Sequence, residues 1–111
     1  MIDPEPQWEV FEMGRLLEKK EQMTFPYLEF IRAPSLSCGI YSLAAGAKDL
    51  QGPHDEDEIY FVISGRARLR VGDEEQDVAA GSVIYIAATA EHRFVEVEED
   101  IKLLVFFGAP A

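Results

Sequence analysis

The sequence predicts an all-β domain with one short helix near its N-terminal end. The prolines at positions 26 and 34 argue against helix beyond the first part of the chain. After Thr24, short runs rich in aromatic and β-branched residues alternate with turn-forming residues, as strands and turns do. These runs do not alternate with long helical segments, which disfavours a doubly wound α/β fold. A sandwich or a barrel is therefore favoured.

The N-terminal part is predicted to be an arm followed by the helix. Residues 1–8 carry prolines and acids and predict a loose arm, with Trp8 as a candidate anchor. Residues 9–23 predict a packing helix, and apolar residues recur on one side of it at Val10, Met13, Leu16 and Leu17. We therefore divide the chain into an arm with a short helix over residues 1–24 and a β-barrel domain over residues 25–111.

The predicted strands are short, and turn-forming residues separate them. Ser64-Gly65 is typical of a tight hairpin between two strands, and Gly72-Asp73 suits a second hairpin. The strands expected are Phe25–Arg32, Leu36–Leu43, Glu58–Ile63, Arg66–Val71, Gln76–Val78, Ser82–Ala87, Glu91–Val97 and Lys102–Phe107.

Side-chain alternation orients two of these strands. Over Glu58–Ile63 both faces are largely apolar, so we expect this strand to be covered on both sides. Over Arg66–Val71 the arginines share one face, which we expect to lie in water, while the apolar residues point to the core.

Composition and charge narrow the function classes. The chain has 111 residues, 48% of them hydrophobic, and a formal net charge of −11. That charge disfavours a phosphate backbone or an anionic membrane as partner, because both attract Lys and Arg. Cys38 is the only cysteine, so no internal disulfide forms, and its apolar flanks predict a small buried side chain. With no signal peptide or membrane-length apolar run in view, we expect a cytoplasmic protein.

Residues 51–66 hold one of only two histidines, then four consecutive acids, then an apolar strand. On one straight strand His54 and Glu58 would lie ~13 Å apart, too far to share an ion. The acids between them form a turn-prone run after Pro53, and a chain reversal there would bring the two side chains face to face. Asp55, Glu56 and Asp57 would then lie at the turn in water.

Glu58 opens an otherwise apolar strand, where a buried carboxylate without a partner is costly. It either lies at the mouth of the strand in water or is compensated by a cation. His92 would supply a third group if the two segments meet. Two imidazoles and one carboxylate leave coordination positions open and suit Fe(II), Zn, Ni or Mn, without selecting one of them. Tyr60 and Phe94 are expected to line such a pocket.

Simpler interpretations of the same residues stay open. A lone histidine is more often a surface or hydrogen-bonded residue than a metal ligand. Asp55 to Glu58 can be a solvated acidic turn. Tyr60 can be a core aromatic whose hydroxyl bonds a neighbour.

The two stretches resemble the motifs of the cupins, which are small β-barrels of the double-stranded β-helix or jelly-roll type. The pattern G-x5-H-x-H-x(3,4)-E-x6-G is matched in its second half by His54, Glu58 and Gly65, and G-x5-P-x-G-x2-H-x3-N is matched by Gly81 and His92. The resemblance covers about residues 36–107. It implies a jelly-roll barrel, a divalent metal ion held by His54, Glu58 and His92 at its inner end, a small molecule in the cavity, and commonly a homodimer.

Both motifs also contain departures. Gly52 stands where the first motif has its first histidine, so the usual four-ligand set is incomplete, and a water or Glu56 would have to fill the fourth position. Ala87, Thr89 and Glu96 replace the proline, glycine and asparagine of the second motif.

Two functions are compatible with this ligand set. The first is a metal-dependent enzyme acting on a small molecule, of dioxygenase or isomerase type or a hydrolase. The second is a non-catalytic small-ligand-binding or sensor protein with weak metal binding or none. The missing histidine at Gly52, and the lack of any base or nucleophile beyond the three ligands, favour the second. The substrate and the oligomeric state do not follow from the residues.

Overall fold

The computed structural model describes residues 7–108, so residues 1–6 of the predicted arm and residues 109–111 lie outside the described part. Within residues 7–108 one helix and six strands follow in the order α1 (Met13–Glu21), β1 (Tyr27–Arg32), β2 (Leu36–Leu43), β3 (Glu58–Val71), β4 (Glu74–Ala79), β5 (Val83–Ile86) and β6 (His92–Gly108). The predicted all-β class with a short N-terminal helix is confirmed. No helix in the described residues is long and apolar enough to cross a membrane.

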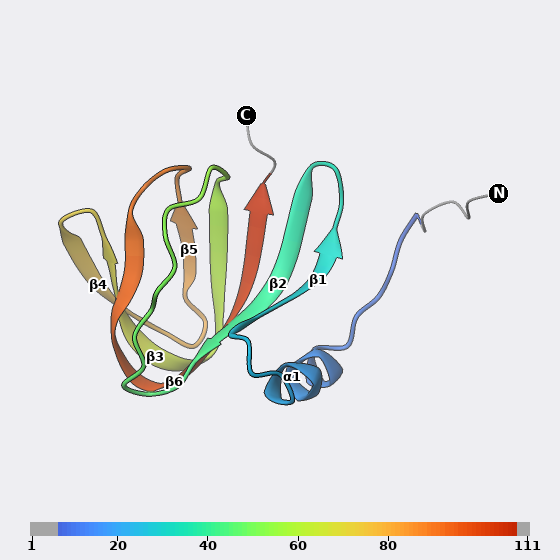
Figure 1. The fold of residues 1–111 in the computed structure, drawn as a ribbon, viewed down its shortest axis with the longest axis horizontal. Helices are drawn as coiled ribbons and strands as arrows, with labels where there is room; N and C mark the ends of the chain where they lie inside the picture. Colours follow the sequence, from blue (N-terminus) through green and yellow to red (C-terminus); the bar gives the residue numbers. More distant parts are fainter. Residues whose placement is uncertain (1–6, 109–111) are drawn as a thin grey trace.

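The strands form one antiparallel sheet in the order β1-β2-β6-β3-β4, with β5 paired to β3. The first half of β3 pairs with β5 and with the end of β6, whereas its second half pairs with β4 and with the start of β6. Figure 1 shows β4 on one side of the molecule and β1 with β2 on the other, joined by the long curved strands β3 and β6. The sheet thus wraps around a common interior as a jelly-roll barrel does.

The hairpin predicted at Ser64-Gly65 is wrong, because β3 runs through these residues without a turn. The pairing of β3 with β6 shifts register on both sides of Ser64, so the strand is bulged and bent there. Gly65 has a φ of +92°, and a side chain at this position would collide with the backbone of Asp100. The glycine therefore serves a bend inside a strand rather than the end of one. The hairpin predicted at Gly72-Asp73 does join β3 to β4.

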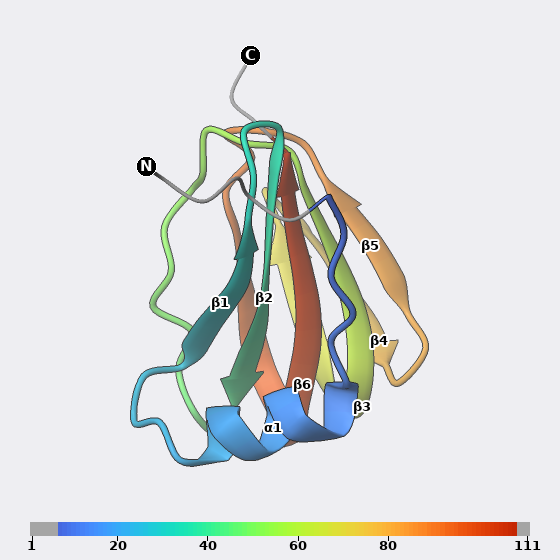
Figure 2. The ribbon, with the colours of Figure 1, turned by 90° about the vertical axis from the view of Figure 1, so that its right-hand side faces the viewer.

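The helix is shorter than the predicted 9–23. Val10 lies before it and is 71% exposed, and Phe11 packs edge-on against Phe30 with ring centroids 5.0 Å apart. Within α1 the buried residue of the predicted apolar side is Leu16. Figure 2 shows α1 lying across the outer side of the sheet near β2. Trp8 is 78% exposed and does not anchor the arm on the described part of the domain.

Alternation along β3 separates core from surface. Within the single chain the first half of β3 is not covered on both faces as expected, because Ile59 and Phe61 are 41% and 38% exposed on the outer face. In the second half the arginines are exposed, as predicted, and Arg66 pairs with Glu98 of β6. The inner face of β3 contributes to the core, whose buried residues are Tyr41, Leu43, Tyr60, Val62, Ala67, Leu69, Val78, Ile86, Phe94, Val97, Ile101, Leu103 and Val105.

Candidate metal centre

The barrel brings His54, Glu58 and His92 together. Each offers a ligand atom, and these atoms all lie within 4.8 Å of one another. His54 comes from the loop between β2 and β3, Glu58 begins β3, and His92 begins β6. Glu58 and His92 are 2% and 6% exposed, so two of the three side chains lie inside the barrel rather than at a wet strand end.

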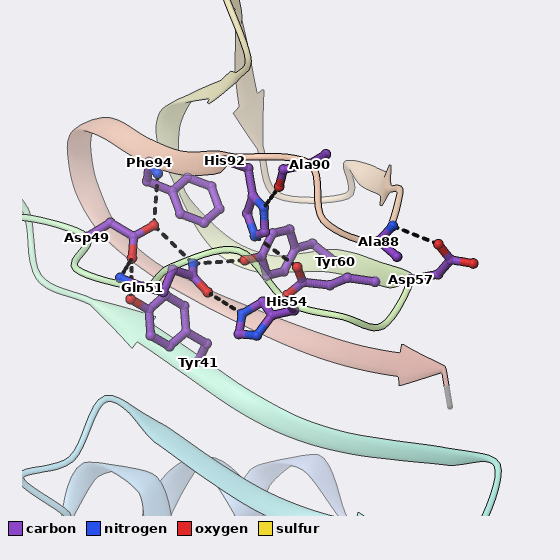
Figure 3. A network of polar contacts seen from close by, with 11 residues as sticks. Tyr41, Asp49, Gln51, His54, Asp57, Tyr60, Ala88, Ala90, His92 and Phe94 are labelled. Carbon is purple, nitrogen blue, oxygen red and sulfur yellow. Dashed lines mark hydrogen bonds and ion pairs between the residues drawn. The ribbon is translucent and has the colours of Figure 1, made fainter. Parts of the chain in front are cut away.

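Two hydrogen bonds fasten the loop of His54 to the loop that precedes His92. The backbone carbonyl of His54 accepts from the Thr89 N–H at 2.7 Å, and the Asp57 carboxylate accepts from the Ala88 N–H at 2.8 Å. Asp57 was expected only to lie solvated at a turn; it is exposed, but it also joins the two loops (Figure 3). Thr89 has a φ of +66°, uncommon for a residue other than glycine, and it stands where the cupin motif has glycine.

The environment of His92 selects which ring nitrogen can bind a cation. Nδ1 lies 2.9 Å from the Ala90 carbonyl oxygen and donates its proton there, which leaves Nε2 with its lone pair (Figure 3). Nε2 is 2.9 Å from Glu58 Oε1, yet the two atoms are not aligned as a hydrogen bond. Nε2 and both Glu58 oxygens are buried without a hydrogen-bond partner in the described part of the chain.

Such an arrangement fits a cation. Buried polar atoms are nearly always hydrogen-bonded, and an unpaired buried carboxylate is strongly destabilising. A divalent ion between Glu58 and the two imidazoles would satisfy all three unpartnered atoms at once, and neutral imidazole with carboxylate is a donor set that such ions accept. The residues present therefore fit the metal that the fold implies.

Protonation of His92 is the alternative to a bound cation. Burial on its own lowers the pKa of His92, but the Glu58 carboxylate and the Ala90 carbonyl outweigh burial, and the pKa is raised above its ordinary value. In the metal-free protein the raised pKa thus favours the protonated form of His92 beside Glu58. Metal binding has to displace that proton.

A cavity of about 200 Å³ is lined by His54 and Glu58, two of the three side chains. Tyr60 lines it, and Phe94 lies behind Tyr60, with ring centroids 5.5 Å apart. Burial, and then the nearby Glu58 carboxylate, raise the pKa of Tyr60 well above its ordinary range, so its hydroxyl stays protonated. The lining residues are Tyr27, Tyr41, Gln51, His54, Glu58, Tyr60, Val105 and Phe107.

A polar network beside the cavity was not predicted from the sequence. Asp49 is buried, and its carboxylate accepts from the Tyr41 hydroxyl at 2.7 Å and from the Phe94 N–H at 2.9 Å (Figure 3). It also accepts from the side-chain amide of Gln51 at 3.0 Å and from the Gln51 backbone N–H at 3.2 Å. An acid in an irregular loop just before the first motif is the sole sequence signal for this network.

Glu56, weighed as a fourth ligand, lies outside the group of converging side chains. It is half-buried and lines a different pocket, along with Tyr27 and Arg32. The group found among the described residues contains His54, Glu58 and His92 alone.

Comparison with known proteins decides the family. The model of the Cupin domain matches residues 39–107. The chain belongs to the cupin family. An uncharacterised protein of Streptomyces coelicolor is 43% identical to this cupin over 100 residues, which is 90% of this chain and 95% of that protein.

Solved structures show the same cupin fold. Protein NMB1881 from Neisseria meningitidis has a TM-score of 0.74 and 13% identity, covering 91% of this chain and 100% of that one. A cupin superfamily protein from Desulfitobacterium hafniense has a TM-score of 0.73 and 18% identity, covering 93% of each chain. At these identities the likeness concerns the fold of the barrel and carries no conclusion about its chemistry.

Proposed function

We propose that this cupin holds a divalent metal ion with His54, Glu58 and His92 and acts on, or binds, a small molecule in the adjoining cavity. The observation that carries the proposal is the convergence of His54, Glu58 and His92, with both Glu58 oxygens and His92 Nε2 buried and without a hydrogen-bond partner in the described residues. Fe(II), Zn, Ni and Mn all suit two imidazoles and one carboxylate. A bound ion would supply Lewis-acid or O2-activating chemistry.

The residues of the cavity support a small substrate or ligand. A volume of about 200 Å³ is below the usual range for drug-sized ligands. Val105 and Phe107 give apolar walls, and the protonated Tyr60 hydroxyl lies among them beside Gln51. These walls would exclude water around the reacting or bound groups, and the metal-facing end would orient the molecule.

Metal analysis tests the ligand set directly. Protein purified without chelator, and then offered Fe(II), Zn, Ni and Mn in turn, is expected to retain close to one equivalent of at least one of them. His92→Ala should lose that ion, whereas Arg93→Ala, an exposed neighbour, should keep it. A wild-type protein that retains none of the four ions would refute the proposal.

A non-catalytic binding protein is the second candidate function. The favouring observation is that the described residues lining the cavity include no base or nucleophile apart from the proposed ligands and tyrosine hydroxyls. Compounds that raise the melting temperature of the metal-loaded protein should be assayed for turnover. Bound compounds that are released unchanged support binding alone, and steady conversion of any of them supports the enzyme.

We also propose a homodimer and a cytoplasmic location, as expected from the sequence. For the dimer, support comes from the outer face of β3, β5 and β6, where partly exposed apolar side chains lie next to one another in the strand pairing. They are Ile59, Phe61, Val83, Tyr85 and Phe106. Light scattering should give twice the chain mass, and Phe61→Lys should halve it, while Arg70→Glu on the exposed arginine face should not.

A further inference from the structure

We propose that Gln51 is the fourth protein ligand of the metal site and that its side-chain oxygen takes the part of the missing histidine. The inference deepens the proposed metal-binding function and rests on it. The cupin motif places the absent ligand at position 52, but Gly52 is exposed and a Cβ built on it would meet nothing within 4 Å. A side chain at 52 would therefore extend into open space, whereas its neighbour Gln51 lines the cavity with His54 and Glu58.

Hydrogen bonds determine which end of the Gln51 amide faces the site. Nε2 donates to Asp49 Oδ2 at 3.0 Å and to the Tyr60 hydroxyl at 2.9 Å, which uses both of its protons. An ionised carboxylate can only accept, so turning the amide over would set two oxygens against each other. Oε1 is consequently the atom directed at His54, as Figure 3 shows.

Oε1 has no strong partner in this position. Its hydrogen-bond contact in the described residues is with His54 Nε2 at 3.4 Å, which is long compared with the roughly 2.9–3.0 Å typical of an N–H···O hydrogen bond. The oxygen keeps lone pairs available beside a nitrogen that is itself a candidate ligand. A carbonyl oxygen there would complete a set of two nitrogens and two oxygens.

Asp49 is the positioning residue for this oxygen. It holds Gln51 at two points, the backbone N–H and the side-chain amide, and it is itself held by Tyr41 and Phe94. The Asp49 carboxylate accepts four hydrogen bonds, and these compensate its buried charge without a cation. These hydrogen bonds hold the loop before β3 so that the side-chain oxygen of Gln51 points into the site.

Cobalt titration of the metal-free protein tests the assignment. Co(II) reports both affinity and coordination through its visible absorption. Gln51→Leu should weaken Co(II) binding at least about tenfold and change the absorption bands, because one oxygen donor is lost. Gln51→Glu restores an oxygen and should bind more tightly than Gln51→Leu. Gln76→Leu, an exposed glutamine of β4, should match the wild type.

Each outcome separates this inference from the metal-binding proposal beneath it. If the wild type binds Co(II) and Gln51→Leu stays within about twofold of it with the same bands, Gln51 is not a ligand although the site exists. Weaker binding with unchanged bands, not restored by glutamate, would show that Gln51 acts through His54 and would overturn the ligand assignment. A wild type that binds no Co(II) refutes both proposals.

Folding is controlled with a milder variant. Gln51→Leu removes the donors to Asp49 and Tyr60, so its circular dichroism and melting temperature are measured without metal first. Gln51→Asn keeps an amide with both donor protons but draws the oxygen back by one methylene. It should show the same weakening of Co(II) binding and the same change in bands, and wild-type behaviour of a folded Gln51→Asn would overturn the inference.

Discussion

Two buried carboxylates lie near the same end of the barrel and have opposite surroundings. Asp49 is 4% exposed, and its oxygens accept four hydrogen bonds from Tyr41, Gln51 and Phe94. Glu58 is 2% exposed, and neither of its oxygens has a hydrogen-bond partner within residues 7–108. The two acids thus share burial and formal charge and differ in what compensates the charge.

The difference shows how a structural acid is told from a candidate ligand. Burial alone does not distinguish them, because both side chains are almost completely covered. A carboxylate with every lone pair engaged stabilises the loops that donate to it. A buried carboxylate whose lone pairs are all free needs a cation or a proton beside it. Either one would lie next to Glu58 Oε1 and His92 Nε2, which are 2.9 Å apart.

Removing Asp49 should produce the largest effect. Asp49→Ala leaves the Tyr41 hydroxyl, the Phe94 N–H and the Gln51 amide buried without their acceptor, so we expect a loss of about 3–5 kcal/mol in the free energy of unfolding. Urea denaturation of the metal-free protein measures it. Asp55→Ala, an exposed acid with no hydrogen bond found, should change stability by less than about 0.5 kcal/mol. Equal losses of stability in Asp49→Ala and Asp55→Ala would show that the hydrogen bonds of Asp49 do not stabilise the fold.

Neutralising Glu58 should have the opposite sign. In the metal-free protein at alkaline pH, Glu58→Gln removes an uncompensated buried charge, which gives a gain of about 1–2 kcal/mol. The same variant should lose the rise in melting temperature that added metal produces in the wild type. Glu74→Gln, exposed on β4, serves as the control. Destabilisation of metal-free Glu58→Gln would show that the carboxylate is already satisfied.

The pH dependence of stability should reverse when metal is added. Burial lowers the pKa of His92, the Glu58 carboxylate and the Ala90 carbonyl raise it more, and the net shift is upward from 6.5. The imidazolium therefore stabilises the metal-free fold fully below the unfolded pKa, and that stability is lost as pH rises through the higher folded pKa. Metal requires the unprotonated ring, so the metal-induced rise in melting temperature should grow over the same interval.

Melting curves at a series of pH values, with and without Zn, check this reversal. His92→Phe should flatten both dependences, because it removes the group that exchanges a proton for an ion. Parallel pH profiles for the metal-free and Zn-loaded wild type would contradict the prediction. The change in stability with pH should be smaller than the loss caused by Asp49→Ala, because only one proton is exchanged.

The sequence predicted the candidate ligands because the residues next to each of them in the chain are unusual. A carboxylate at the start of an apolar strand, two histidines in all, and turn-prone residues around each were visible in the residues themselves. Alternation also predicted the exposed arginines of β3. The predicted hairpin at Ser64-Gly65 was wrong, because the sequence does not distinguish a glycine in a β-bulge from a glycine in a turn.

The Asp49 network could not be predicted because its partners are distant in the chain. Phe94 contributes only a backbone N–H to Asp49, and any residue except proline carries one. The inward direction of Gln51 depends on two hydrogen bonds that its side-chain amide donates, one to Asp49 and one to Tyr60 of β3. Pattern and spacing identify residues of unusual type, whereas this orientation depends on three-dimensional contacts between ordinary ones.

Cys38 is a further buried ionisable side chain that can be compared with Asp49 and Glu58. The prediction for it concerns a labelling rate and is the smallest of the expected effects. Cys38 is 1% exposed, and burial raises the pKa of its thiol to about 11, so it avoids the problem of Glu58 by keeping its proton. Below that pKa the thiolate that reacts with disulfide reagents is rare, and modification at mildly alkaline pH should be at least about a hundredfold slower than that of a free thiol. Urea should restore the ordinary rate. Rapid labelling of the native protein would mean that β2 opens readily and that burial in this barrel does not by itself suppress charge.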